Sequence, residues 1–429
     1  MGMARWLVGM GMGLVLPALA LAAEGLPPSV QQALNQARIP AGQVAVAIQP
    51  LDGRAPLLQH NVSQPLNPAS VMKLVTTYAG LKLLGPAATW KTGAWSDGEV
   101  SSDGRLDAPL YLRGSGDPKL VLEHFTALLR QLRVRGLREL NGDLVLDRSA
   151  FALPGEDPGN FDARPMRPYN IGPDALLINF RAINLNLRPE NGQVRVLNDT
   201  PAEGLRLDNR LNLTQEECGD WKDKLGLRLR EEGRGAWRLE LTGNFSSQCG
   251  EKVFNLAPLG ADAQVESLFR ALWGEQGGSF RGRVRSGVMP VGVRLLAQTE
   301  SPTLVEVIRD INKYSNNVMA RQLFLALDEQ QPATLESARR RVKTWLLSRS
   351  SQFADVELDN GSGLSRRERI SAQSLIRLLQ LAWNDPLMPE FIASLPIVGV
   401  DGTMQKRLVD SAAGGQGHIK TGTLEGVKT

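Results

Sequence analysis

A long β-rich stretch interrupts a chain whose two ends are patterned for helices. Between about residues 91 and 280, short runs of alternating apolar and polar residues are separated by Gly, Asn and Asp, which predicts strands joined by turns. A chain of 429 residues is too long for one ordinary core. We therefore expect an α/β domain that is split by an insert of one or two β-rich domains.

Several short runs carry the strand prediction within the insert. Asn191-Gly192 separates two of them and marks a hairpin turn. The runs are Leu110–Leu112, Leu144–Leu146, Ile183–Leu187, Val194–Val196 and Trp237–Leu241.

The flanking regions show helical spacing and helix-capping signals. A helix is predicted from Ser70 to Leu83, and Thr303 with Glu306 forms the capping box of another. Further helices are expected over about 334–349 and over 371–384, the latter capped by Ser371. The alternation over 42–61 predicts a hairpin, and a short strand is expected over 418–423.

The first 22 residues have the pattern of a secretory signal. Arg5 is followed by an apolar stretch, and Ala20-Leu21-Ala22 provides small residues where a signal peptidase cuts. The alternative is an uncleaved anchor, although the stretch is short for a membrane span. No second apolar run of that length follows, so membrane association is expected to be peripheral at most.

Two cysteines, Cys218 and Cys249, are the only ones in the chain. In an exported protein they predict one disulfide, which would close a loop of about 30 residues and stabilise the fold by about 3 kcal/mol. The alternative is two unpaired thiols. Their spacing is not that of a C-x-x-C redox or zinc site.

Composition and missing motifs exclude several classes of protein. The formal charge of +4 comes from 49 basic and 45 acidic residues, which does not indicate a nucleic-acid binder. The three histidines are far apart in sequence, so no metal site is expected. The chain contains neither a G-x-S-x-G elbow nor a phosphate-binding G-x-x-x-x-G-K-[ST] loop. We expect no cofactor.

A serine enzyme without a suitable histidine needs another base, and Ser70-x-x-Lys73 provides one. On a helix, side chains three residues apart lie on one face within reach of each other. The helix dipole at the first turn favours an alkoxide on Ser70. A lysine whose pKa is lowered by burial can take the serine proton near neutral pH. Alone, the motif also fits a helix cap beside a solvated lysine.

Two later motifs complete a set with the first. Ser315 begins an S-x-N sequence that ends at Asn317, and Lys420–Gly422 reads K-T-G. In this set a second serine can relay a proton, an asparagine can hold an amide, and the Lys420 ammonium can attract a carboxylate. Thr421 adds a hydroxyl group, and glycine permits close approach of an acyl chain to the backbone. Each motif alone fits an ordinary cap or loop, but the three together in this order indicate one active site.

With these motifs, the chain resembles the penicillin-recognising serine enzymes. It is most similar to the D-alanyl-D-alanine carboxypeptidase/endopeptidases of peptidase family S13, the class C low-molecular-mass penicillin-binding proteins. That family has a large insert between its first two motifs, and here Ser315 follows Lys73 by 242 positions. Three further stretches match the family, namely Gly114–Pro118, Asp359–Arg366 and Val400–Thr403.

The resemblance implies a fold and binding partners. The fold would be a penicillin-binding transpeptidase-like domain with an antiparallel sheet flanked by helices. The compartment expected from the predicted signal peptide is the periplasm. The partners would be peptidoglycan stem peptides as substrates and β-lactams as inhibitors.

The resemblance also implies roles for individual residues. Ser70 would be the acylated nucleophile and Lys73 its base, with Ser315 and Asn317 completing the proton relay. A further group would bind the substrate: Lys420 and Thr421 at its terminal carboxylate, Gly422 beside its acyl chain, Thr423 together with Ser70 in the oxyanion hole, and Arg366 at the diaminopimelate end of the stem peptide. For Arg366, a surface ion pair is the alternative. A Y-x-N frame starting at Tyr314 is less favoured than the S-x-N frame.

The expected domain bounds follow from these patterns. They are a signal at 1–22, a first transpeptidase-like part at 23–90, the insert at 91–280, and a second transpeptidase-like part at 281–429. The sequence stops seven residues after Gly422, whereas the family continues with further strands and a helix. We therefore expect the sequence to be a fragment that lacks those elements.

Two other functions remain open on the sequence. A β-lactamase would share the acylation step, but no E-x-x-L-N segment for rapid deacylation stands at the expected distance. A non-catalytic wall-binding protein could keep the fold, but the three intact motifs speak against it.

Overall fold

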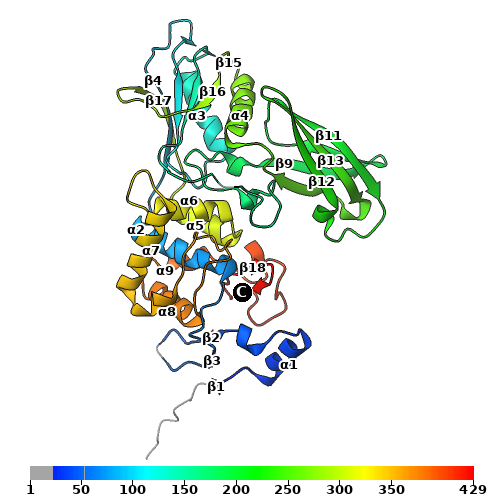
Figure 1. Ribbon diagram of the computed structural model, residues 1–429, viewed down its shortest axis with the longest axis vertical. Coiled ribbons are helices and arrows are strands. Elements are labelled where there is room, and N and C mark those ends of the chain that lie inside the picture. The colour runs from blue at the N-terminus through cyan, green and yellow to red at the C-terminus, as the bar shows by residue number, and fades with distance from the viewer. Residues whose placement is uncertain (1–22, 53, 156) are drawn as a thin grey trace, which may run out of the picture.

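The computed structural model describes residues 23–52, 54–155 and 157–429, so the predicted signal at 1–22 lies outside the described residues. Figure 1 shows a helical body built from both ends of this part of the chain, with the middle of the chain projecting away from it. The N-terminal and C-terminal parts of the chain therefore fold together into one body, and the insert projects from it, as the sequence predicts.

Helix α2 (Lys73–Leu83) lies at the centre of the body, and its residues 73–81 are all buried. It contacts four other helices, α5, α6, α7 and α9. Burying a large apolar side chain contributes about 1.5–3 kcal/mol, so this packing fixes α2 and the residues at its start. The body helices are α1 (Pro28–Gln36), α2, α5 (Leu304–Lys313), α6 (Asn317–Ala326), α7 (Leu335–Arg349), α8 (Ala372–Trp383) and α9 (Met388–Ala393).

The predicted caps open two of these helices. Glu306 accepts a hydrogen bond from the Thr303 backbone N–H (2.9 Å), and Ser371 accepts one from the Ser374 N–H (3.0 Å). Each cap satisfies a backbone donor that the helix itself leaves unpaired. Within the described residues, no helix is both long and apolar enough to cross a membrane.

Short strands lie on the body. The predicted hairpin consists of β2 (Val46–Ile48) and β3 (Leu58–His60), and β1 (Ala23–Glu24) pairs with β3. At the other end of the chain, β18 (Thr423–Leu424) pairs with β19 (Val427–Lys428).

The first unit of the insert is a five-stranded mixed sheet in the order β16-β8-β6-β4-β17. Two helices, α3 (Leu122–Val134) and α4 (Ala261–Glu275), pack on it, although the sequence pattern predicted only strands here. The sheet continues past residue 280, the expected end of the insert, because β16 and β17 complete it. Its strands are β4 (Lys91–Ser96), β6 (Leu110–Arg113), β8 (Leu144–Asp147), β16 (Val284–Ser286) and β17 (Arg294–Glu300), beside a small sheet of β5 (Arg105–Leu106), β7 (Glu139–Leu140) and β15 (Ser279–Phe280).

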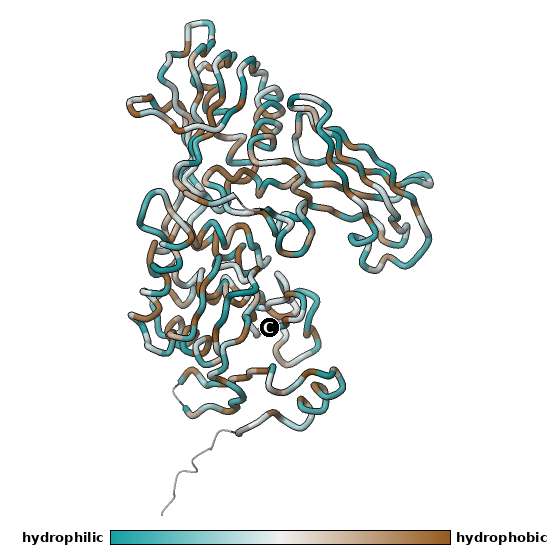
Figure 2. The backbone as a smooth tube through the Cα atoms, in the orientation of Figure 1, coloured by the Kyte–Doolittle hydropathy of each residue, from teal (hydrophilic) through white to brown (hydrophobic). Residues whose placement is uncertain are grey.

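The second unit consists of two three-stranded sheets that share a core. The Asn191-Gly192 turn joins β9 to β10, with positive φ at both residues, as the hairpin prediction requires. Figure 2 shows apolar and polar residues alternating along this sheet pair. Cys218 and Cys249 form the predicted disulfide beside this core. The strands are β9 (Ile183–Glu190), β10 (Gln193–Asn198), β14 (Lys252–Leu256), β11 (Leu205–Thr214), β12 (Leu225–Gly233) and β13 (Ala236–Ser246).

Candidate active site

Ser70 and Lys73 meet at the start of α2. Ser70 lies in a 3₁₀ turn (Ala69–Met72) that leads directly into the helix, and Lys73 is the first helical residue. Asn67 holds the turn, since its side-chain oxygen accepts a hydrogen bond from the Ala69 N–H at 2.9 Å. The Lys73 Nζ lies 2.9 Å from the Ser70 Oγ. The helical spacing of S-x-x-K therefore produces the predicted contact.

The environment of Lys73 lowers its basicity. The side chain is fully buried, and its three hydrogen-bond acceptors carry no charge: Ser70 Oγ, Asn317 Oδ1 at 2.6 Å and the Ser362 carbonyl at 2.5 Å. Burial, and then the nearby charges of Lys420 and Arg321, hold the pKa of Lys73 well below its ordinary value. In its neutral form the amine has two hydrogens for Asn317 and Ser362, which leaves its lone pair for the Ser70 hydroxyl.

A buried glutamate that the sequence analysis did not single out shapes the loop over Lys73. The Glu368 carboxylate is fully buried and accepts backbone N–H bonds from Gly361 (2.8 Å), Asn360 (3.1 Å) and Asp359 (3.3 Å). These bonds fix the loop that carries the Ser362 carbonyl. The Asp359–Arg366 stretch was noticed as a family signature, but a glutamate just after it has no local signal of this role.

Ser315 and Lys420 form the second contact of the site. Ser315 lies between α5 and α6 with a φ of 56°, and its Oγ is 3.0 Å from the Lys420 Nζ. Lys420 also donates to the Thr421 carbonyl at 2.7 Å. Burial lowers the pKa of Lys420 to about 7. Ser315 thus contacts Lys420, while Asn317 contacts Lys73, and the S-x-N frame is the one that reaches both lysines.

The K-T-G stretch precedes a strand instead of lying within one. The strand expected over 418–423 begins only at Thr423. Gly422 already exchanges both backbone hydrogen bonds with Thr429, so the ladder starts there. A Cβ on Gly422 would lie 2.8 Å from the Pro68 carbonyl oxygen. Glycine is therefore needed for close packing against the turn that carries Ser70, a reason that differs from the predicted approach of an acyl chain.

Arg366 lies at the rim of the site and is half exposed. It donates to the Glu425 carbonyl oxygen at 2.8 Å, and its guanidinium lies 5.2 Å above the Phe161 ring. The Glu425 carboxylate is 3.9 Å away and almost fully exposed. The ion pair that was the alternative interpretation of Arg366 is thus present, and it leaves the guanidinium facing the cleft.

One cleft of about 850 Å³ has Ser70, Ser315 and Asn317 on its wall, with Lys73 and Lys420 buried behind them. Its walls come from Ser70 before the insert, from the loop at residues 161–169 of the insert, and from residues after the insert. The described residues contain no group of three or more His, Cys, Asp or Glu side chains suited to a metal ion. The cleft is lined by Ser70, Phe161, Asp162, Arg164, Tyr169, Tyr314, Ser315, Asn317, Leu364, Arg366, Thr403, Thr421, Thr423, Leu424 and Glu425.

Comparisons with known proteins identify one family. Residues 26–429 match the D-Ala-D-Ala carboxypeptidase 3 (S13) family. The D-alanyl-D-alanine carboxypeptidase DacB of Haemophilus influenzae is 25% identical over 380 residues, which cover 86% of this chain and 78% of that protein. A D-alanyl-D-alanine carboxypeptidase of an Actinomadura species is 26% identical over 397 residues, covering 86% and 71%.

A solved structure shares the fold. The crystal structure of penicillin binding protein 4 (dacB) from Haemophilus influenzae superimposes with a TM-score of 0.74 at 24% sequence identity. The match covers 92% of this chain and 88% of that one. The insert and the helical body are therefore both part of a known architecture.

Proposed function

This chain belongs to the D-Ala-D-Ala carboxypeptidase 3 (S13) family, and we propose that it cleaves peptidoglycan stem peptides after a D-alanine through an acyl-enzyme on Ser70. It is a serine hydrolase of the carboxypeptidase/endopeptidase type. The observation that carries the assignment to Ser70 is the 2.9 Å contact with the Lys73 amine, whose other two acceptors are fixed oxygens.

Acylation begins with proton transfer from Ser70 to the neutral Lys73 amine. The Ser70 Oγ then forms a bond to the carbonyl carbon of the penultimate D-alanine, and the C–N bond to the next residue breaks. Ser315 gives its hydroxyl proton to the leaving nitrogen and takes in its place the proton that Lys73 received, while Lys420, whose Nζ lies 3.0 Å from the Ser315 Oγ, stays protonated. Water then gives one proton to the neutral Lys73 amine and bonds to the acyl carbon. The ester C–O bond breaks, and Lys73 returns the proton to the Ser70 Oγ.

Substrate binding falls to the stretch after residue 419. Lys420 and Thr421 bind the terminal carboxylate, and the backbone N–H groups of Ser70 and Thr423 stabilise the oxyanion. The register of the β18–β19 hairpin supports the role of Thr423. Because Gly422 and Thr429 form the hydrogen-bonded pair, Thr423 belongs to the next, non-bonded pair, and its N–H points away from β19.

We also propose that the protein acts outside the cytoplasm, in the periplasm. The disulfide between Cys218 and Cys249 supports an oxidising compartment. The signal pattern of residues 1–22 supports export. Association with a membrane would be peripheral.

Digestion of purified peptidoglycan fragments tests the proposed activity. Monomers with D-Ala-D-Ala ends should release free D-alanine, and cross-linked dimers should yield monomers. The Ser70→Ala variant should neither release D-alanine nor cleave the dimers, although its melting temperature should equal that of the parent protein. If the parent chain turned over nitrocefin rapidly but left both fragments intact, the β-lactamase alternative would replace this proposal. A chain that formed no penicillin adduct and cleaved neither fragment would instead be a wall-binding protein.

A further inference from the structure

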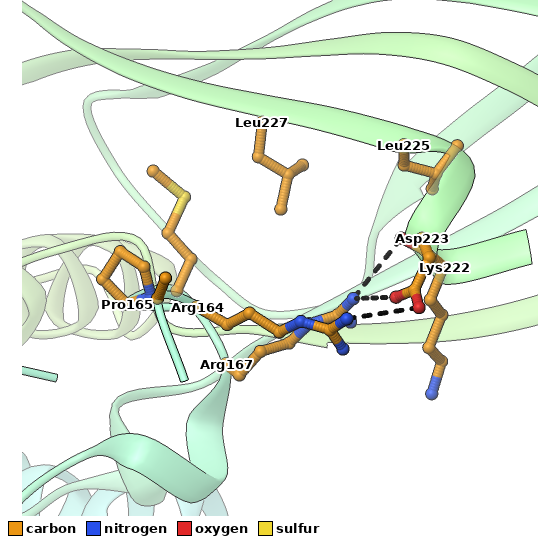
Figure 3. Close-up of a pocket in the computed structure, with 9 residues that line it drawn as sticks. Arg164, Pro165, Arg167, Lys222, Asp223, Leu225 and Leu227 are labelled. Carbon is orange, nitrogen blue, oxygen red and sulfur yellow. Dashed lines mark hydrogen bonds and ion pairs between the residues drawn. The ribbon is translucent and has the colours of Figure 1, made fainter. Parts of the chain in front are cut away.

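A second cleft, of about 270 Å³, opens beside the catalytic one where the loop at residues 163–167 of the insert faces residues 222–227 of the same insert. Figure 3 shows the side chains of Arg164 and Arg167 reaching toward Asp223, with Lys222 and Leu225 beside Asp223 and Leu227 further along the cleft. We call Arg164, Arg167 and Lys222 the basic cluster. This cleft lies outside the residues that carry the proposed chemistry.

The basic cluster has an excess of positive charge. Among the described residues, Asp223 is the one carboxylate that pairs with the cationic side chains, at 3.2 Å from Arg164 and 3.8 Å from Arg167. The Lys222 ammonium lies 5.5 Å above the Trp221 ring and forms no hydrogen bond or ion pair within the described part of the chain. Burial and the neighbouring Arg167 lower the pKa of Lys222, as expected for a cation that lacks an anion. Three cations therefore share a single anion.

The cluster is built into the fold. The Arg167 guanidinium lies 4.8 Å above the Phe254 ring of β14, and its side chain is only 13% exposed. Arg167 also donates to the Lys222 carbonyl oxygen at 3.4 Å, which links the loop to the 3₁₀ turn Trp221–Lys224. A cation held in place in this way loses little conformational entropy when an anion binds.

Shared walls connect the basic cluster to the catalytic centre. Arg164 lines both the second cleft and the catalytic cleft. A third cleft of about 540 Å³ shares Arg167 and Lys222 with the second cleft and Ser315 and Asn317 with the catalytic cleft. We call the three clefts, which are linked by these shared wall residues, the groove.

We propose that this groove binds the second, carboxylate-bearing peptide of a cross-linked substrate, with the basic cluster contacting its carboxylate. The proposal rests on the proposed function and names what would favour endopeptidase over carboxypeptidase action. A short peptide ending in D-Ala-D-Ala fills the catalytic cleft alone. A cross-linked dimer carries a further chain with its own carboxylates, and the groove offers that chain a path and a counter-charge.

A charge reversal tests the proposal. Lys222→Glu places an anion where the peptide carboxylate would bind. We expect kcat/KM for a purified cross-linked muropeptide dimer to fall about tenfold, mainly through KM, because one charge-assisted contact becomes repulsive. For an acetylated tripeptide that ends in D-Ala-D-Ala and has no other carboxylate, kcat/KM should stay within about twofold, as no contact is lost.

Lys224→Glu is the matched control. Lys224 belongs to the same 3₁₀ turn, lines none of the three clefts and pairs with Glu216 at 3.4 Å. The same charge change there should affect neither substrate. Unchanged dimer cleavage by Lys222→Glu, or an equal loss for both substrates, would overturn the proposal. Failure of the proposed function would appear differently, as absent penicillin acylation in the parent protein.

Discussion

At the floor of the catalytic cleft, Lys73 is fully buried among uncharged oxygens, whereas at the rim Arg366 is half exposed beside the carboxylate of Glu425. At the floor, burial and then the nearby charges of Lys420 and Arg321 lower the pKa of Lys73, so its neutral amine is available as a base. The rim pairs a cation in solvent, where such a pair contributes little free energy. Under the proposed function, charge serves proton transfer at the floor and substrate recognition at the rim, so substitutions should have much larger effects at the floor.

Removing the base should have the largest effect. Lys73→Met keeps the length of the side chain but has no amine, so the rate of acylation by labelled penicillin should fall by about 10²–10⁴-fold. Stopped-flow or quenched labelling measures this rate. The variant should fold, because the lost cation had no ionic partner. A rate near that of the parent would show that another group takes the Ser70 proton.

Removing the buried carboxylate of Glu368 should cause the second-largest loss of activity. Glu368→Ala removes the acceptor of three backbone N–H groups and frees the loop that carries the Ser362 carbonyl. A misplacement of about 1 Å can cost about 10²-fold, so we expect a fall of that order in kcat with little change in KM. Glu368→Gln keeps an acceptor oxygen and should recover most of the activity. If both variants lost only thermal stability, Glu368 would have no positioning role.

The pH profile separates the two lysines. Under the proposed function, Lys420 binds the substrate carboxylate in its protonated form, and its pKa is about 7. Above that pH, kcat/KM for a peptide with a free terminal carboxylate should fall about tenfold per unit, since kcat/KM reports the free enzyme. On the acid side of the profile, kcat/KM should increase with pH as Lys73 loses its proton. Because the pKa of Lys73 is well below its ordinary value, this increase should occur well below the usual lysine range. Lys420→Arg should move the alkaline limb upward, and an unmoved limb would assign it to another group.

Substitution of Arg366 at the rim of the cleft should have the smallest effect on activity. Arg366→Ala removes one exposed cation, and we expect KM for a peptide bearing a carboxylate on its third residue to rise about two- to fivefold. The melting temperature should not change. Peptides without that carboxylate serve as the control. A loss of activity as large as that of Lys73→Met would contradict the expected difference between substitutions at the floor and at the rim.

Local patterns predicted much of this molecule. The S-x-x-K spacing, the Thr303 and Ser371 caps and the Asn191-Gly192 turn all depend on residues a few positions apart, and each has the expected geometry. The meeting of Ser315 with Lys420 followed from the resemblance, because nothing in the intervening sequence encodes that contact.

Other features could not be predicted because they depend on distant backbone. Glu368 acts through backbone N–H groups and a carbonyl, which carry no sequence signature. The α3 segment has Phe125, Leu128 and Leu132 at helical spacing, but the short strand runs around it dominated the pattern. The K-T-G stretch reads as a strand, yet the ladder can start only where Thr429 provides a partner.

Mass mapping of the penicillin adduct tests the central claim most directly. After brief incubation with a labelled penicillin and proteolysis, the label should be found on the peptide that contains Ser70, in a ratio of one per chain. It should be absent from the Ser70→Ala variant and form very slowly in Lys73→Met. Label on any other residue, or label that persists in Ser70→Ala, would contradict the account.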